Sequence, residues 1–228
     1  MHEGNVSITL GMKGIPSIAE SIQIQRNCKL TKYANSSLIA HAISSKKSLN
    51  LLQEATKKNI DVKSTVSYMN LVADHRMLEN FNSNFKVTPP LRLESDSKDL
   101  FNAVRKGRID AIVSNHVPLE SEKKLLEFPY ATPGAIGLET CFAALNTTYG
   151  SHLDVIVHAL SESPRSILNI PIPRVSTGEK ANLTLFDPDT KWTFEKSASL
   201  SQNSPFIGRE FTGRTVATIN GSKYHISK

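Results

Sequence analysis

The amino-acid sequence predicts an α/β fold, with a parallel sheet and helices followed by a smaller β module. Segments with strand and helix patterns alternate four times between residues 38 and 116, as in βα units whose strands lie parallel. Residues 109–114 form an apolar, β-prone run, which is typical of the buried strands of parallel sheets. After residue 180 apolar and polar residues alternate, and an Asn220-Gly221 pair follows, which predicts antiparallel strands and a hairpin.

The composition narrows the classes of protein to consider. The 228 residues are 39% hydrophobic and 21% charged, which supports a substantial core and excludes a disordered chain. The net charge of +6 comes from scattered lysines and arginines, without the basic, aromatic-interleaved stripe of nucleic-acid-binding proteins. No apolar run approaches the ~20 residues of a membrane span, and the first residues lack a signal-peptide pattern. We therefore expect a cytoplasmic protein that binds neither nucleic acid nor membranes.

The amino-terminal third predicts an irregular start and then the first βα units. Residues 1–16 are glycine-rich and predict turns. Ser17 and Glu20 have the spacing of a capping box, which predicts that a helix begins at Ser17. The apolar run 38–43 predicts a buried strand, and residues 46–58 carry apolar side chains at helical spacing.

The middle of the chain predicts a further alternation of strands and helices. Residues 61–68 alternate and are rich in β-branched side chains, which predicts a second strand. A short helix is expected over 73–80 and a third strand over 85–88, stopped by two prolines. A helix over 95–105 leads to the fourth strand, 109–114.

The last part of the chain predicts helices and then a β module. Helices are expected over 139–149 and 153–162. Strands are expected over 181–187 and 192–194, with a hairpin over 214–225. Both cysteines, Cys28 and Cys141, lie in apolar helical patterns without metal-site spacing, so we expect buried thiols.

The carboxyl ends of the predicted parallel strands are the candidate site, because right-handed crossovers bring them to one edge. These ends carry two histidines, His41 and His116, and no carboxylate. A catalytic zinc normally takes three protein ligands, so this set does not predict a metal site. No nucleophile elbow, P-loop or dinucleotide fingerprint occurs. We expect both histidines to be hydrogen-bonded structural residues, and they remain the only candidates for a residual polar site.

Several stretches of the sequence carry a resemblance to a known family. They are Met-His-Glu-Gly at 1–4, Leu-Gly-Met-Lys-Gly-Ile-Pro at 10–16, Ile-Ser-Ser at 43–45, Asn-Phe-Lys-Val-Thr-Pro-Pro-Leu-Arg at 84–92, residues 110–118, Gly-Leu-Glu-Thr at 137–140, and Gly-Glu-Lys-Ala-Asn-Leu-Thr-Leu-Phe-Asp at 178–187. The chain resembles the dihydroorotases of the multifunctional-complex type, within the amidohydrolase superfamily. The resemblance implies a TIM-like barrel flanked by a β-sandwich formed from both chain ends. Residues 1–172 would be the C-terminal half of the barrel, and 173–228 a portion of the sandwich.

The same resemblance implies that several metal and substrate positions of the family have been replaced. A family histidine falls on Ala42, with His41 one place away. A pair of family histidines falls on Met69 and Asn70, and a family asparagine falls on Thr88. The family uses zinc, and we predict no bound cofactor here.

The motif with the family's catalytic aspartate is also altered. The aspartate falls on Asn115, followed by His116, and the last histidine of that motif falls on Leu119. An amide does not accept a proton at neutral pH, so Asn115 cannot act as a general base. The family's opening H-x-H motif would precede Met1, so we expect this sequence to be the C-terminal portion of a longer protein.

Two functions follow from these observations as hypotheses. The first is a non-catalytic dihydroorotase-like protein of pyrimidine biosynthesis that supports aspartate carbamoyltransferase as a structural or regulatory partner. The second is an active cyclic amidohydrolase whose metal site is completed by residues upstream of Met1, with His41 and His116 as ligands. The free edges of half a barrel also predict self-association.

Overall fold

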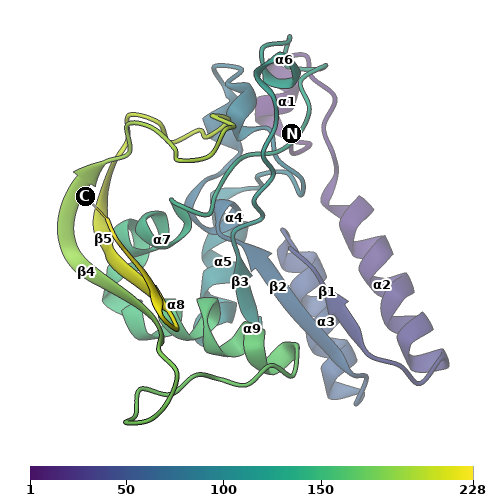
Figure 1. The fold of residues 1–228 in the computed structure, drawn as a ribbon. Coiled ribbons are helices and arrows are strands. Elements are labelled where there is room, and N and C mark those ends of the chain that lie inside the picture. Colours follow the sequence, from purple (N-terminus) through teal and green to yellow (C-terminus); the bar gives the residue numbers. More distant parts are fainter. Residues whose placement is uncertain (228) are drawn as a thin grey trace.

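A computed structural model describes residues 1–227 of the chain. A parallel sheet lies at its centre, and an antiparallel sheet lies to one side (Figure 1). The parallel sheet has the strand order β1-β2-β3, with the register Leu38↔Val62 and Thr65↔Ala111. Its strands are β1 (Leu38–Ala40), β2 (Val62–Ser67) and β3 (Ala111–Val113). The predicted βα alternation is therefore confirmed for these strands.

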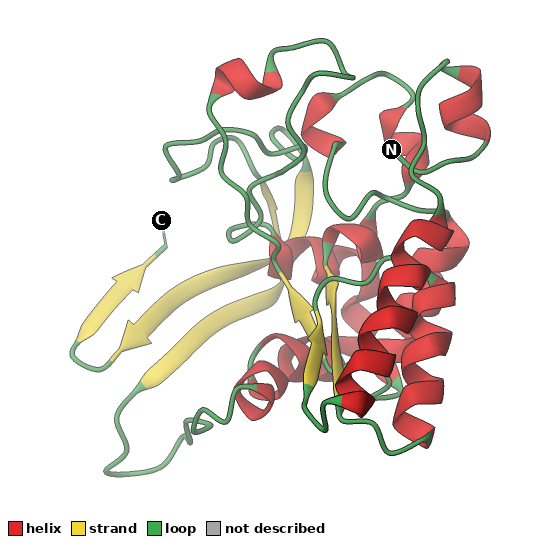
Figure 2. Ribbon diagram, turned by 90° about the vertical axis from the view of Figure 1, so that its right-hand side faces the viewer, coloured by secondary structure: helices red, strands yellow, loops and turns green. Residues whose placement is uncertain are grey.

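Long helices stand side by side along one flank of the parallel sheet (Figure 2). They are α2 (Ser17–Tyr33), α3 (Lys46–Lys57) and α5 (Glu94–Arg105). Their buried side chains join those of the strands in one main core, which includes Leu52, Val66 and Leu100. Removal of this apolar surface from water is the main stabilising contribution. None of the helices within residues 1–227 is long and apolar enough to cross a membrane.

Short helices fill the connections. They are α1 (Asn5–Thr9), α4 (Met69–Val72), η1 (His75–Leu78), η2 (Ser83–Phe85), α6 (Ser121–Lys124), α7 (Cys141–Tyr149), η3 (Gly150–His152), α8 (Leu153–Leu160) and α9 (Glu162–Ile167). Both cysteines are buried free thiols, as expected.

The antiparallel sheet has the order β4-β5-β6. Its strands are β4 (Asn182–Thr193), β5 (Glu210–Asn220) and β6 (Lys223–Ile226). Asn220 pairs with Lys223, so the predicted hairpin is confirmed. Asn146 of α7 donates hydrogen bonds from Nδ2 to the carbonyl oxygens of Pro188 (2.8 Å) and Thr212 (2.9 Å). A Cβ at Gly213 would lie 2.6 Å from that Nδ2 atom, so only glycine fits where the sheet meets α7.

The predicted strand over 85–88 is wrong. Residues 83–85 form η2, and Asn82 caps it by accepting a hydrogen bond from the Asn84 backbone N–H at 3.0 Å. The following prolines cannot donate to a strand ladder. The local turn chemistry of the asparagines therefore replaces the strand.

The short helix predicted over 73–80 is present in part, as the 3₁₀ helix η1 over His75–Leu78. Ala73 is extended, with φ −139° and ψ 153°, and ends α4. The Asp74 carboxylate then accepts a hydrogen bond from the Arg76 backbone N–H at 2.8 Å and begins η1. This amino-terminal cap separates η1 from α4 and shortens the predicted helix.

The structure of residues 1–227 does not contain the β-sandwich that the resemblance implies. A single three-stranded antiparallel sheet takes its place, and the amino-terminal residues add no strand to it. The division of the chain near residue 172 stays a prediction.

Candidate functional site at the strand ends

The end of β1 carries His41 and Ala42. His41 is exposed, and its Nδ1 lies 3.3 Å from Oγ1 of Thr65. Ala42 is buried and has φ 53°, in the left-handed region that alanine rarely adopts. Its backbone N–H donates to Oγ1 of Thr65 at 2.8 Å. One threonine hydroxyl on β2 therefore fixes the end of β1.

The end of β2 is filled by large buried side chains. The Tyr68 hydroxyl lies 2.9 Å from Oγ1 of Thr140, and burial raises the pKa of Tyr68. Met69 is buried in the main core. Asn70 is buried and donates from Nδ2 to the carbonyl oxygen of Pro90 at 2.9 Å. Its Oδ1 atom has no hydrogen-bond partner among the described residues.

Asn115, after β3, has φ 44° and contacts the loop that holds Thr88. Its Nδ2 donates to the carbonyl oxygen of Thr88 at 2.9 Å. A carboxylate has no proton to donate at neutral pH and would repel that carbonyl oxygen. This contact therefore suits the amide that is present and would be lost with an aspartate.

His116 is held by the segment that follows it in space. Its Nδ1 accepts hydrogen bonds from the backbone N–H groups of Gly137 (3.0 Å) and Leu138 (3.4 Å). A Cβ at Gly137 would lie 2.7 Å from the carbonyl oxygen of Ser114, so glycine permits this close approach. The Nδ1 lone pair of His116 is thus occupied by the N–H groups of Gly137 and Leu138.

Leu119 takes part through its backbone only, because its N–H donates to Oδ1 of Asn203 at 3.2 Å.

These residues do not make a zinc site. Zinc in proteins takes thiolate, imidazole or carboxylate ligands. Ala42 offers a methyl group, Met69 a buried thioether, and Asn70 and Asn115 amides that bind backbone carbonyls. Within residues 1–227 no group of three or more histidine, cysteine, aspartate or glutamate side chains is arranged to hold a metal ion. The described residues therefore do not fit the metal that the resemblance implies.

A buried ionic cluster lies outside the predicted site residues. The Glu20 carboxylate accepts hydrogen bonds from the backbone N–H groups of Ser44 (3.1 Å) and Ser45 (3.2 Å) and from both hydroxyls. Arg92, only 2% exposed, donates to Oγ of Ser44 at 3.1 Å and lies 3.2 Å from Nδ1 of His2. The sequence offered a way to find these residues, since Ser44, Ser45 and Arg92 all lie in the stretches that resemble the dihydroorotases. We predicted a capping box for Glu20 instead, and that was wrong.

The fold places the chain in a class of known structures. It aligns with an L-hydantoinase (dihydropyrimidinase) from Arthrobacter aurescens with a TM-score of 0.84 and 26% identity, over 91% of this chain and 49% of that one. A D-hydantoinase (dihydropyrimidinase) from Thermus sp. aligns with a TM-score of 0.78 and 21% identity, over 90% and 48%. The fold is a partial α/β barrel of the amidohydrolase type with a small additional sheet.

The comparison with curated protein sequences gives a narrower class than the comparison with solved structures. A dihydroorotase of Syntrophus aciditrophicus is 34% identical over 225 residues, which are 96% of this chain and 53% of that protein. The dihydroorotase of Bacillus subtilis is 33% identical over 229 residues, or 98% and 54%. No protein-family model matches. The chain spans about half the length of the curated relatives it matches, and within that span its sequence is similar to dihydroorotases.

Proposed function

We propose that this chain is a non-catalytic, dihydroorotase-like component of pyrimidine biosynthesis in the cytoplasm. The contact between Asn115 and the Thr88 carbonyl carries the proposal. The position that resembles the family's catalytic aspartate holds a hydrogen-bond donor bound to backbone, so it has no base to offer. The methyl group of Ala42 and the buried thioether of Met69 support the same conclusion at two other strand ends.

Conversion of Asn115 to aspartate tests this proposal. We expect the purified chain to show no turnover of dihydroorotate with zinc present, and Asn115→Asp to gain none. The variant should also lose about 0.5–1.5 kcal/mol of unfolding free energy, because the solvent-exposed hydrogen bond to the Thr88 carbonyl is lost. Asn80→Asp is the matched control, since Asn80 Oδ1 only accepts a hydrogen bond, from the Asn82 N–H at 3.1 Å.

A partner role for the chain is the second part of the proposal. By resemblance to inactive family members, the expected partner is aspartate carbamoyltransferase. Size-exclusion chromatography of the chain mixed with that enzyme should show co-elution. Separate elution at micromolar concentrations would remove the partner role while leaving the catalytic prediction intact.

An active amidohydrolase is the alternative. It is favoured by one observation, namely that His41 and His116 both lie at strand ends. In that case the metal site would need further ligands from residues outside these 228, so the assay has to use the chain within a full-length protein. Zinc-dependent turnover of dihydroorotate by that protein, lost in His41→Ala and His116→Ala, would support the alternative and contradict the proposal.

A further inference from the structure

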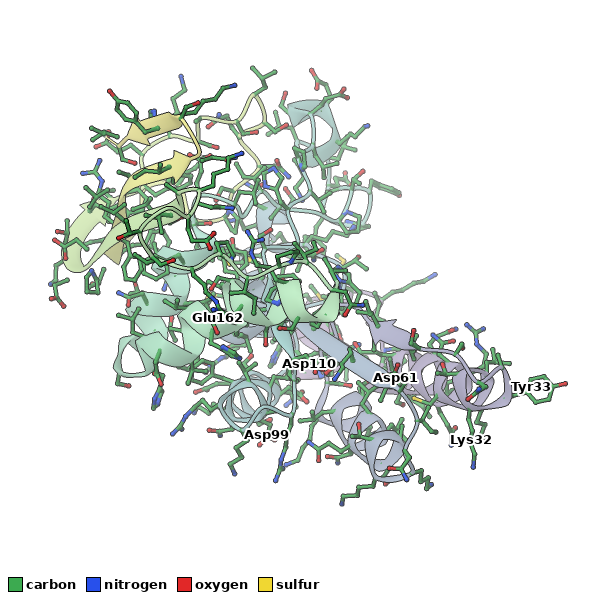
Figure 3. The ribbon with its side chains drawn as sticks, turned by 60° about the horizontal axis from the view of Figure 1, so that its bottom comes forward. Lys32, Tyr33, Asp61, Asp99, Asp110 and Glu162 are labelled. Atoms are coloured by element: carbon green, nitrogen blue, oxygen red, sulfur yellow. The ribbon has the colours of Figure 1, made fainter. Side chains whose placement is uncertain are left out.

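A groove opens where the parallel strands begin, on the side of the sheet opposite the candidate functional site. One hollow, of about 430 Å³, lies beside the start of β2 and is lined in part by Lys57, Val62, Lys63, Arg108 and Asp110. A second hollow, of about 190 Å³, lies between α3 and α5 and shares Gln53 and Arg108 with the first. Figure 3 looks toward this side of the molecule, with Asp110 labelled. We call the two hollows together the α3–α5 groove.

The α3–α5 groove gathers basic side chains that are scattered in the sequence. They are Lys46, Lys57, Lys63, Lys106 and Arg108. Helix α3, strand β2 and the turn that follows α5 contribute them, so only the fold brings them together. A cleft lined by one sign of charge raises the local concentration of ions of the opposite sign.

The two carboxylates that line the groove are already paired. Nζ of Lys46 lies 2.9 Å from Oδ2 of Asp99, and Nζ of Lys63 lies 3.6 Å from Oδ1 of Asp110. Oδ2 of Asp110 also accepts a hydrogen bond from the backbone N–H of Ser64 at 2.7 Å. These carboxylates therefore balance two of the five positive charges and leave three.

The remaining three cations are free to bind a ligand. Lys57, Lys106 and Arg108 are exposed, and none of them forms an ion pair with a residue in the range 1–227. Gln53 and Asn102, which line the same groove, add side-chain amides that donate hydrogen bonds. The Arg108 guanidinium presents paired N–H groups whose geometry matches two oxygens of a phosphate.

We propose that the α3–α5 groove binds a small polyphosphate anion, either free or as the phosphate chain of a nucleotide. Such a chain carries several negative charges close together, which matches three cations without a counter-charge. The larger hollow lies within the roughly 300–1,000 Å³ of small-molecule sites. Of the described residues that line it, only Val62 has an apolar side chain, so an apolar ligand would not fit. The groove is separate from the strand ends, so the proposal does not depend on whether the chain is catalytic.

Calorimetric titration of the 228-residue chain tests the proposal, with inorganic tripolyphosphate and ADP as probes. We expect one site per chain for each probe at low ionic strength, and weaker binding at about 0.15 M salt, because salt screens the attraction. Equal affinities would identify the phosphate chain as the recognised group, and tighter binding of ADP would identify a nucleotide as its source. The absence of saturable binding of both probes at low ionic strength would overturn the proposal.

Substitutions locate the site. Arg108→Gln and Lys106→Gln should each weaken tripolyphosphate binding about tenfold, as expected when a hydrogen bond to a charged group is lost. Lys32→Gln removes the same charge from an exposed position on α2, which Figure 3 shows apart from Asp110, and should change the affinity less than about twofold. Equal weakening by Lys32→Gln and Arg108→Gln would show that only the net charge matters and would contradict the proposal.

A single-stranded RNA oligonucleotide is the third probe, because it also carries phosphates. We expect it to bind more weakly than tripolyphosphate. RNA binding that is tighter than tripolyphosphate binding, and that is lost in Arg108→Gln, would assign the groove to nucleic acid and contradict the proposal.

Discussion

The backbone at Ala42 has a conformation that costs energy for alanine. With φ 53° and little exposed surface, Ala42 keeps its conformation because its N–H is bound to Thr65. A non-glycine residue in the left-handed region costs roughly 1–2 kcal/mol. Ala40, two residues earlier on β1, is equally buried but extended. The two alanines therefore differ mainly in backbone conformation.

This difference predicts opposite effects of the same substitution. Ala42→Gly should leave stability unchanged or raise it by up to about 1 kcal/mol, since glycine relieves the strain. Ala40→Gly should lower stability by about 1 kcal/mol, because glycine weakens a strand. Urea denaturation measures both. Equal destabilisation by the two variants would show that the left-handed conformation of Ala42 stores no strain.

Residue positions at the strand ends were predictable, whereas their contacts were not. The apolar runs before His41 and Asn115 located the ends of two strands. The bond from Asn115 to Thr88 joins residues 27 positions apart and depends on a loop that we predicted as a strand. The bond from His116 to Gly137 likewise depends on the approach of a distant segment.

At the scale of elements, Glu20 joins α2 to the segment between β1 and α3. Its carboxylate receives hydrogen bonds from two serines, and Arg92 lies 4.0 Å away. The capping-box prediction considered only Ser17, three residues away. The helix begins at Ser17, as predicted, but Pro16 is its N-cap and no side chain caps it. The Glu20 carboxylate binds the donors of Ser44 and Ser45 rather than the start of its own helix, because a partly buried carboxylate is stabilised most where several donors converge.

Removal of the Glu20 charge should therefore destabilise the whole fold. Glu20→Gln places an NH2 group, itself a donor, beside the N–H and hydroxyl donors of Ser44 and Ser45. It also leaves buried Arg92 without the negative charge of Glu20. Because Glu20 is 16% exposed and lies 4.0 Å from Arg92, we expect a loss of about 1–3 kcal/mol of unfolding free energy. Glu54→Gln on the exposed side of α3 is the control and should change stability by less than about 0.5 kcal/mol. If chemical denaturation gave equal values for the two variants, the cluster would have no stabilising role.

At the scale of the whole molecule, buried cationic groups make stability depend on pH. Lys124 donates from Nζ to the carbonyl oxygens of Thr132 and Gly134, both at 3.0 Å. Burial, and then the nearby charge of Lys86, lowers the pKa of Lys124 from 10.5 to about 8. The unfolded chain therefore binds more protons than the folded chain between those values, and stability rises with pH there.

Cys141 has the opposite effect. Burial raises the pKa of its thiol from 9.0 to about 12, so above pH 9.0 the unfolded chain loses a proton that the folded chain keeps. The unfolding free energy should thus rise between about pH 8 and pH 9.0 and level off between pH 9.0 and 10.5, where the two effects oppose each other. Lys124→Met should flatten the rise, and Cys141→Ala should remove the loss above pH 9.0. Denaturation curves between pH 7 and 10.5 measure this, and a pH-independent stability in the parent chain would contradict it.

The overall class was predictable from the sequence because the βα alternation and the hairpin turn are local patterns. The helices α7 and α8 lie within the predicted ranges 139–149 and 153–162. The bounds of η1 and η2 were not predictable, since the side-chain caps of Asp74 and Asn82 decide them.

The strand ends of this chain present no zinc ligand set of their own, and the zinc content of the purified chain measures this property. After incubation with zinc and dialysis, elemental analysis of the purified chain should find less than about a tenth of an equivalent, as expected when a three-ligand set is lacking. One or more equivalents retained by the chain, and lost in His116→Ala, would contradict the claim.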